Sequence, residues 1–520
     1  MIAAAHPKGP YIDWAALSPV VALLGASLVV LMLGLLPGRW AREQLVPLKT
    51  IAGFAVAIGC TIWQWDTSKD VVAGALRIDR LMLLSTLLIS AAGIAGTLVA
   101  WRSRAAKEIA HGEFFSLLLM SAAGMVVLAS AQNLVMTFTG LELLSLPLYI
   151  LCASRMRSER SLESGLKYLI VGSVGSATLL YGFALIYGAT GTTDYAAIAK
   201  AASREGMTGD VLFLTGVGLS VVGLAFKSSL APFHQWTPDV YEGAPTPVTA
   251  FMSVGTKVAA FAAMVRLFDV ALGGATDDWK PIWEVVAVAS ILVGNVGALG
   301  QSSLKRMLAY SSIAQAGYIL VGFLVGTAGG VEAVIYYLIV YLIANLAAFA
   351  VVIARERETG NDDLASLRGL GASNAVLAGS MTIAMFSLAG IPATAGFIGK
   401  FNIISSAVDG DVTWLGIMIV VGSMISLAYY VPVISVIWRG GSAAPVPARV
   451  DPRTGLAALA GGSSEADELS IDEPEGEPQT AGIEVTATAF LLGVATLAFG
   501  IVPQPLFNLV AGAARGLGLG

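Results

Sequence analysis

Five ionisable residues lie inside strongly apolar stretches of the sequence. They are Glu142, Lys167, Lys227, Lys257 and Lys400. A charge inside a membrane costs several kcal/mol unless it is paired or hydrated, so such residues are functional candidates by default. Removal from water disfavours the charged form of an amine or a carboxyl, and an opposite charge nearby restores it. A lysine whose partner comes and goes can bind and release a proton, so these residue types indicate a proton relay.

The relay is expected to start with Glu142 paired to Lys227, and to continue through Lys257 to Lys400. Lys257 lies about 12 residues into its apolar stretch, which is roughly 18 Å along a helix and close to the middle of a membrane. For Lys227 the alternative is a lysine that snorkels to the surface beside a proline kink. Three such lysines in one chain favour the relay over a purely structural role, because buried lysines are costly.

Four further residues are candidates for relaying protons or ordering water: Lys167, His234, Lys305 and Gln315. Lys167 follows Glu163 by four residues, so a local ion pair on one helix is an equal alternative. An unperturbed histidine titrates near neutral pH, so His234 is expected either to bridge the first relay steps or to hold a structural hydrogen bond. Glutamine orders water but cannot hold a proton, so Gln315 is expected to act through water.

Proline-containing breaks interrupt two of the apolar stretches. Residues 226–251 read FKSSLAPFHQWTPDVYEGAPTPVTAF and break near Pro232, and a later stretch breaks near Pro392. Proline has no N–H for the helix ladder and clashes with the preceding turn. Non-helical backbone at membrane depth is tolerated only where protein or a water-filled cavity satisfies it. We therefore expect both broken helices to line a polar interior, with Lys227 before the first break and Lys400 after the second.

The composition predicts an all-α integral membrane protein. Of 520 residues, 56% are hydrophobic and only 12% charged, whereas soluble domains carry about 25% charged residues. Windows of about 20 apolar residues predict about fourteen transmembrane helices. These lie near residues 14–36, 46–65, 78–101, 113–130, 132–152, 163–189, 210–230, 246–270, 281–299, 304–326, 331–354, 374–408, 413–437 and 485–510.

A faint internal repeat indicates two five-helix units. SLAP before the first break is similar to SLAGIP before the second, and KYLIV at 167–171 is similar to YYLIV at 336–340. An odd number of helices per unit inverts the second copy across the membrane, which places paired broken helices around a polar site near the midplane. The expected divisions are an N-terminal three-helix segment 1–110, repeats 111–271 and 279–438, a disordered acidic inner loop 439–484, and a C-terminal helix 485–520.

Charge distribution predicts the orientation, and the cysteines argue against a metal site. Seventeen of the 30 Lys and Arg fall in loops on one side and nine in loops on the other, so the positive-inside rule places both termini on the outer face. Cys60 and Cys152 lie in different apolar segments without nearby ligands at metal-binding spacing. We expect no metal and no cofactor in this chain, no nucleic-acid partner, and no cleaved signal peptide.

Four motifs resemble the antiporter-like subunits of respiratory complex I, over about residues 75–440. They are TGLELLSLPLY (139–149), residues 226–251 quoted above, LKRMLAYSSIAQAGY (304–318) and SLAGIPATAGFIGKF (387–401). The second motif, together with a lysine at position 400, is most similar to the subunit N branch of that family. One departure concerns Gln315, where many relatives have a histidine. If that position relays protons in those relatives, it must act through water here.

The resemblance implies a fourteen-helix subunit that translocates protons in the membrane arm of a bacterial cell-membrane complex. It implies that Glu142, Lys227, Lys257 and Lys400 match the family's proton-transfer residues, and that Lys167 matches the lysine of helix six. It also implies that NADH, flavin, iron–sulfur clusters and quinone belong to partner subunits. The expected partners are other membrane-arm subunits and the lipid bilayer, and the enzyme activity is that of the whole NADH:quinone oxidoreductase.

Two other classes of protein remain open at this point. A subunit of a multi-subunit cation/proton antiporter would use the same lysines without redox coupling, so a copurifying NADH dehydrogenase arm would distinguish the two. A passive structural membrane subunit is disfavoured because a scaffold has no need of costly buried lysines.

Overall fold

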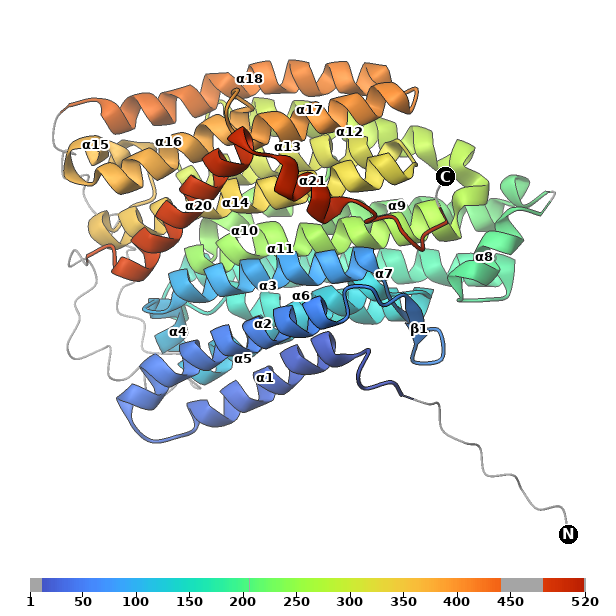
Figure 1. The fold of residues 1–520 in the computed structure, drawn as a ribbon, viewed down its shortest axis with the longest axis horizontal. Coiled ribbons are helices and arrows are strands. Elements are labelled where there is room, and N and C mark those ends of the chain that lie inside the picture. Colours follow the sequence, from blue (N-terminus) through green and yellow to red (C-terminus); the bar gives the residue numbers. More distant parts are fainter. Residues whose placement is uncertain (1–11, 205, 441–479, 519–520) are drawn as a thin grey trace, which may run out of the picture.

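The structure is a computed structural model that describes residues 12–204, 206–440 and 480–518. Most of the acidic loop predicted at 439–484 lies outside the described residues. The chain is mainly helical, and its long helices run roughly side by side, with α1 at one edge of the bundle and α18 at the other (Figure 1). The first and last described segments lie at the same end of the bundle, near α8 and the β1–β2 hairpin (Figure 1).

The elements follow one another along the chain in three groups. The first contains α1 (Ser18–Gly34), η1 (Ala41–Leu45), α2 (Val46–Trp63), β1 (Lys69–Val71), β2 (Leu76–Ile78), α3 (Arg80–Ala100) and α4 (Arg104–Glu108). The second contains α5 (His111–Ser130), α6 (Leu134–Cys152), α7 (Glu159–Thr190), α8 (Tyr195–Ala202), η2 (Met207–Gly209), α9 (Val211–Lys227), α10 (Trp236–Gly243), α11 (Thr246–Met264), η3 (Val265–Ala271) and η4 (Gly273–Ala275). The third contains α12 (Thr276–Ala298), α13 (Leu304–Leu324), α14 (Ala328–Thr359), η5 (Leu364–Leu367), α15 (Leu370–Ser373), α16 (Ala375–Ala389), α17 (Ala395–Asp409), α18 (Thr413–Trp438), α20 (Ile483–Ile501) and α21 (Gln504–Val510).

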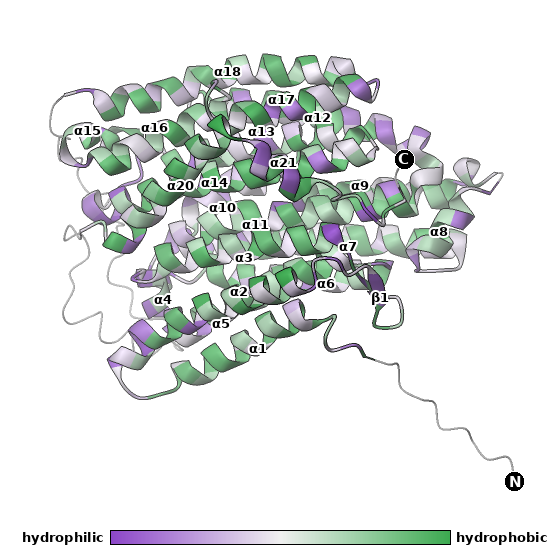
Figure 2. Cartoon of the chain, in the orientation of Figure 1, coloured by the Kyte–Doolittle hydropathy of each residue, from purple (hydrophilic) through white to green (hydrophobic). Residues whose placement is uncertain are grey.

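The helices have the length and hydropathy of membrane spans. Among the described residues, 11 helices are long and apolar enough to cross a membrane, and three shorter apolar helices, α1, α9 and α16, have 15 to 17 residues. Apolar residues cover much of the helix lengths, and hydrophilic residues gather toward the ends of the bundle (Figure 2). Each predicted span overlaps at least one of these helices.

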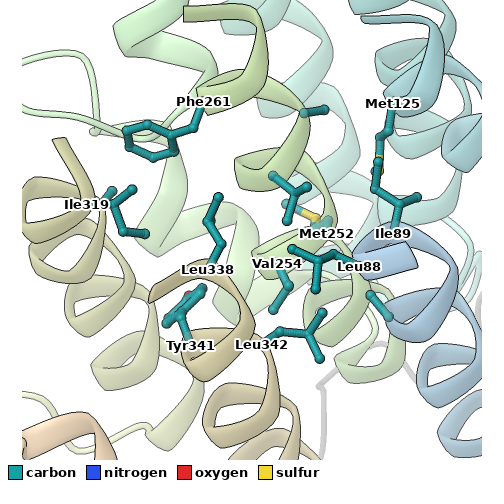
Figure 3. Packing of buried hydrophobic residues seen from close by; sticks show 14 of the residues in the cluster. Leu88, Ile89, Met125, Met252, Val254, Phe261, Ile319, Leu338, Tyr341 and Leu342 are labelled. Atoms are coloured by element: carbon teal, nitrogen blue, oxygen red, sulfur yellow. The ribbon is translucent and has the colours of Figure 1, made fainter. Parts of the chain in front are cut away.

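Helices α11 and α14 form the buried centre of the bundle. The apolar windows of both helices are wholly buried, unlike those of peripheral helices such as α18 and α20. Figure 3 shows Met252 and Val254 of α11 between Leu342 of α14 on one side and Leu88 of α3 on the other. A charged or hydroxylated side chain on α11 or α14 therefore faces protein and not lipid, which is the setting that the lysines require.

Both helices that were predicted to break are interrupted. Helix α9 ends at Lys227 and α10 begins at Trp236, and in the intervening backbone Ser229 has φ 61°. Helix α16 ends at Ala389, where Gly390 takes the left-handed conformation with φ 85°, and α17 begins five residues later. Glycine adopts this conformation without a steric penalty, so it ends the helix at a defined point.

The two broken helices run in opposite directions. The helix before α9 is α8, at one end of the bundle, whereas the helix before α16 is α15, at the opposite end (Figure 1). Helices α7 and α14, which are the third members of the two predicted repeats, each contain 32 residues. The opposite directions of α9 and α16 and the equal lengths of α7 and α14 are what an inverted repeat predicts.

Local structure differs from the sequence prediction in two places. The chain between α2 and α3 forms a short antiparallel hairpin, with Lys69 opposite Ile78, so the described part is not purely helical. The predicted C-terminal helix is two helices, α20 and α21, separated at Val502 and Pro503. Proline cannot continue the hydrogen-bond ladder of α20, and it is well suited to the first turn of α21.

Candidate proton relay

Lys227 ends α9 and lies at the first break, where its side chain is buried. Its Nζ donates hydrogen bonds to Ser145 Oγ of α6 at 2.8 Å and to Tyr168 Oη of α7 at 3.1 Å. Glu142 lies three residues before Ser145 on α6 and is half-buried. Its Oε1 has no hydrogen-bond partner in the described part of the chain. The predicted pair is therefore not a direct ion pair in the described part of the chain, because neutral hydroxyls hold the ammonium.

Aromatic side chains continue from Lys227 toward the centre of the bundle. The ring of Tyr168 stacks on Trp236 of α10, with centroids 4.6 Å apart and planes 7° apart. Trp236 meets Tyr241 edge to face at 6.3 Å. Helix α10, which follows the break, thus packs against Tyr168, the phenol that accepts from Lys227.

Lys257 lies on α11 at the centre of the bundle and is 1% exposed. Its Nζ donates to Ser312 Oγ at 2.6 Å, and Tyr341 Oη of α14 donates to the same oxygen at 2.9 Å. A serine oxygen has two lone pairs, so it accepts both bonds. Ser312 therefore joins the second lysine to α14.

Lys400 lies just beyond the second break and holds the end of α16. Its Nζ donates to the backbone carbonyls of Leu388 and Ala389 at 2.9 and 3.0 Å, and to Ser423 Oγ of α18 at 3.0 Å. A cation at the C-terminal end of a helix satisfies orphan carbonyls and stabilises the helix dipole. The break therefore supplies the partners that this buried charge needs.

Gln315 lies on the same helix as the partner of the second lysine and bonds to a partner of the third. It lies one turn after Ser312 on α13, and its Nε2 donates to the Leu388 carbonyl at 3.1 Å, so this carbonyl accepts from both Gln315 and Lys400. Tyr337 Oη of α14 donates to Gln315 Oε1 at 2.5 Å. The position that was predicted to act through water thus lies between Lys257 and Lys400.

The three lysines share one chemical setting. Among the described residues, none of the three ammonium groups forms an ion pair, and each bonds to hydroxyls or backbone carbonyls. An ammonium held by neutral groups loses only hydrogen bonds when it gives up its proton, whereas a buried ion pair would leave an uncompensated charge. Deprotonation of any of the three lysines would therefore break no salt bridge within the described residues.

The remaining candidates occupy different settings. Lys167 is 43% exposed and pairs with Glu163 at 2.8 Å, which confirms the local ion pair that the four-residue spacing predicts, and with Asp239 at 3.0 Å. Lys305 is buried, and its Nζ donates to the Ala244 carbonyl at the end of α10 at 2.8 Å. His234 lies in the first break and is half-buried. No hydrogen bond in the described part joins it to Lys227.

Sequence reasoning missed the tyrosines of this region: Tyr168, Tyr241, Tyr337 and Tyr341. A signal for two of them was present in the repeat, since Tyr168 of KYLIV and Tyr337 of YYLIV occupy the same place. Their hydrogen bonds differ, because Tyr168 accepts from Lys227 whereas Tyr337 donates to Gln315. Within residues 12–204, 206–440 and 480–518, no group of three or more His, Cys, Asp and Glu could hold a metal ion.

Comparison with protein families matches most of this region. Residues 131–426, more than half of the chain, match the family described as NADH:quinone oxidoreductase/Mrp antiporter, transmembrane. The matched segment contains Glu142, the three relay lysines and both breaks. The chain therefore belongs to this family of antiporter-like membrane subunits.

Within the family, the chain is similar to curated proteins named subunit N. NADH-quinone oxidoreductase subunit N of Trichlorobacter lovleyi is 44% identical over 385 residues, which cover 74% of this chain and 78% of the relative. The subunit N of Desulforamulus reducens is 36% identical over 504 residues and covers 97% of this chain and 98% of the relative.

Solved structures show the same architecture. A chain of respiratory complex I from Thermus thermophilus matches with a TM-score of 0.75 and 31% identity, covering 94% of this chain and 98% of that one. A chain of the Mrp complex from Dietzia sp. matches with a TM-score of 0.82 and 25% identity, covering 97% of each. The fold is thus shared between redox-driven complexes and antiporters, while the named sequence relatives are subunits of the quinone oxidoreductase.

Proposed function

We propose that the chain is a membrane-arm subunit of bacterial NADH:quinone oxidoreductase and that it translocates protons through its buried lysines. The observation that carries this proposal is that Lys227, Lys257 and Lys400 are buried and each held by neutral groups, with Ser312 beside the second lysine and Gln315 sharing the Leu388 carbonyl with the third. In this proposal Glu142, half-buried on α6 three residues before Ser145, would bias the first lysine electrostatically. A scaffold would have no use for three such groups, because each lowers stability unless it performs a function.

The free energy that proton transfer along this row of lysines requires is within reach of one lysine. A proton that moves against about 150 mV requires roughly 3.5 kcal/mol, at about 2.3 kcal/mol per 100 mV. A change of two to three pKa units at one lysine supplies that amount, at about 1.36 kcal/mol per unit. Redox chemistry in partner subunits would supply the driving force by changing the charge near Glu142 or at the breaks. In this proposal, NADH, flavin, iron–sulfur clusters and quinone are bound by those subunits and not by this chain.

The architecture that we propose for this function has fourteen crossings. The 11 long apolar helices supply most of them, and α1, α9 and α16 supply the rest, with α16 continued by α17. Helices α5–α11 and α12–α18 would form two inverted units, with 1–110 as an N-terminal segment and 485–520 at the C-terminal end. The positive-inside distribution supports both termini on the outer face. The first and last described segments lie at one end of the bundle, which agrees with this orientation (Figure 1).

A copurification experiment separates this function from that of an ion-gradient antiporter. An affinity tag on this chain is expected to recover an assembly that oxidises NADH with quinone and, in vesicles, acidifies the lumen when NADH is added. The antiporter alternative predicts that no NADH-oxidising arm is recovered and that a sodium or potassium gradient drives proton movement. That second outcome would overturn the proposed function.

A further inference from the structure

The aromatic ring of Tyr318 lies beside the ammonium group of Lys400. Tyr318 is on α13, three residues after Gln315, and ends the motif at residues 304–318. Its side chain is 0% exposed, and Lys400 Nζ lies over its ring, 4.7 Å from the centroid. A cation within about 6 Å of a ring centroid is attracted by the quadrupole of the ring. The third lysine therefore has an aromatic partner in addition to its oxygen partners.

Tyr318 meets the lysine with its ring, because its hydroxyl is engaged elsewhere. Tyr318 Oη accepts a hydrogen bond from Asn295 Nδ2 of α12 at 2.9 Å. The ammonium of Lys400 donates to two carbonyls at the end of α16 and to Ser423 Oγ of α18. An ammonium has three N–H donors, so these bonds use all of them. The ring contact thus adds to the hydrogen bonds of Lys400 and replaces none of them.

The other two lysines contact their tyrosines less closely through the ring. The ring centroid of Tyr168 lies 5.3 Å from Lys227 Nζ, and that of Tyr341 lies 6.0 Å from Lys257 Nζ. Tyr168 also accepts a hydrogen bond from its lysine at 3.1 Å, so its ring is near as a consequence of that bond. The hydroxyl of Tyr318 makes its bond to a different helix, so its ring contact is an independent feature of the site.

Helices α12 and α18 hold the ring of Tyr318 in place. Tyr429 Oη of α18 donates to Asn295 Oδ1 at 2.9 Å, and Asn295 is 0% exposed. The amide therefore links the hydroxyl of Tyr318 to α18. Gly422 of α18 leaves room for this pair, since a Cβ there would lie 2.7 Å from Tyr318 Oη and 3.0 Å from Asn295 Nδ2. Any side chain at position 422 would displace the phenol or the amide.

We propose that Tyr318 is a positioning residue for proton transfer at Lys400, and that its ring holds the ammonium at the end of α16 by a cation–π contact. The inference rests on the proposed function. The Leu388 carbonyl at this end of α16 accepts from both Gln315 and Lys400, so an ammonium held there stays beside a group that α13 also contacts. The ring attracts a cation and not a neutral amine, so it acts while the lysine carries its proton.

A double-mutant cycle tests the contact without a measurement of pumping. The thermal midpoint of the solubilised complex is compared for Tyr318→Leu, Lys400→Met and the double variant. If the two side chains interact, Tyr318→Leu lowers the midpoint less when position 400 is already methionine. Tyr195→Leu is the matched control, because Tyr195 is a buried tyrosine of α8 that bonds to Thr137 of α6, and its loss is expected to be equal in both backgrounds. An equal loss for Tyr318→Leu in both backgrounds would overturn the proposal.

Pumping separates the ring of Tyr318 from its hydroxyl. A desolvated cation–π contact changes an equilibrium constant by roughly 30-fold. NADH-driven acidification of vesicles, per assembled complex, is therefore expected to fall at least about tenfold in Tyr318→Leu and to stay within about twofold of the wild type in Tyr318→Phe, which keeps the ring. Wild-type pumping by Tyr318→Leu would overturn the proposal, and an equal loss in Tyr318→Phe would assign the role to the hydroxyl instead.

A substitution that changes neither partner covers the case in which Tyr318→Leu does not assemble. Gly422→Ala leaves both Tyr318 and Lys400 in place but displaces the phenol, so it is expected to lower pumping in the same assay, and unchanged pumping would overturn the proposal. If wild-type vesicles do not respond to NADH, the proposed function fails. The thermal cycle then still decides whether the ring holds the lysine.

Discussion

Replacing Lys257 by arginine tests whether this side chain must release its proton. The lysine lies at the centre of the bundle, is 1% exposed, and bonds to Ser312 Oγ at 2.6 Å. Arginine keeps the positive charge and can donate to the same hydroxyl. Guanidinium does not deprotonate in proteins, so the substitution separates a fixed charge from a proton carrier.

The magnitudes show which effect of the substitution dominates. The pKa of a guanidinium lies at least about five units above pH 7, so releasing its proton costs roughly 7 kcal/mol at about 1.36 kcal/mol per unit, which slows any step that needs it by about 10⁵-fold. Overpacking of a buried site by a larger side chain costs about 1–3 kcal/mol. The protonation cost exceeds the packing cost, so an assembled Lys257→Arg complex is expected to show no coupled turnover.

The assay compares NADH-driven acidification of vesicles with the amount of complex assembled. Lys305→Arg is the matched control, because Lys305 is also buried but its ammonium caps the Ala244 carbonyl, a role that arginine can keep. We expect Lys305→Arg to retain pumping and Lys257→Arg to lose it. If Lys257→Arg pumps at the wild-type rate, Lys257 is a fixed charge, and protons must pass between Lys227 and Lys400 by water alone.

Three further predictions concern the breaks, the N-terminal helices and the acidic loop. A Cβ at Gly396 would lie 1.8 Å from a carbonyl oxygen of α16, so Gly396→Ala is expected to disrupt the second break and abolish pumping, whereas Gly379→Ala, with open space around it, is expected to be neutral in the same vesicle assay. Arg266 and Asp79 form an ion pair at 2.6 Å, 1% and 0% exposed. Arg266→Ala removes the closer of the two cations beside the buried Asp79 carboxylate and leaves only Arg77, at 3.7 Å. The loss is expected to cost up to about 3–5 kcal/mol, seen as a lower thermal midpoint of the solubilised complex, and an unchanged midpoint would contradict this. Shortening 441–479 while keeping the helices connected is expected to leave pumping intact, because the composition of the segment indicates a solvated tether; loss of pumping in an assembled complex would show a specific partner.

Much of the fold was predictable because hydropathy reports burial in lipid directly. The predicted spans overlap the observed helices, and Pro232 and Pro392 mark both interruptions, since proline acts locally on the backbone. The hairpin at Lys69–Val71 was not predicted, because strands of three residues give too short a pattern. The interruption between α20 and α21 at Pro503 was also not predicted, because the segment is apolar and long enough to read as one helix.

The charged residues of the site were predictable from the sequence, but their hydrogen-bond partners were not. A buried lysine is conspicuous in an apolar sequence, so Lys227 and Lys400 could be found by composition alone. Their partners come from distant segments, Tyr168 lying 59 residues before Lys227 and Ser423 lying 23 residues after Lys400. The role of Lys305 was not predictable, because nothing in its sequence context reveals that it caps the end of α10.

The measurement that tests the central claim most directly is the number of protons moved per NADH oxidised by the assembled complex carrying Lys227→Ala or Glu142→Ala. The exposed Lys200→Ala serves as the control. The account predicts that both relay variants assemble but lose proton translocation together with coupled quinone reductase activity, while the control matches the wild type. An assembled Lys227→Ala complex that moves the wild-type number of protons per NADH would contradict it.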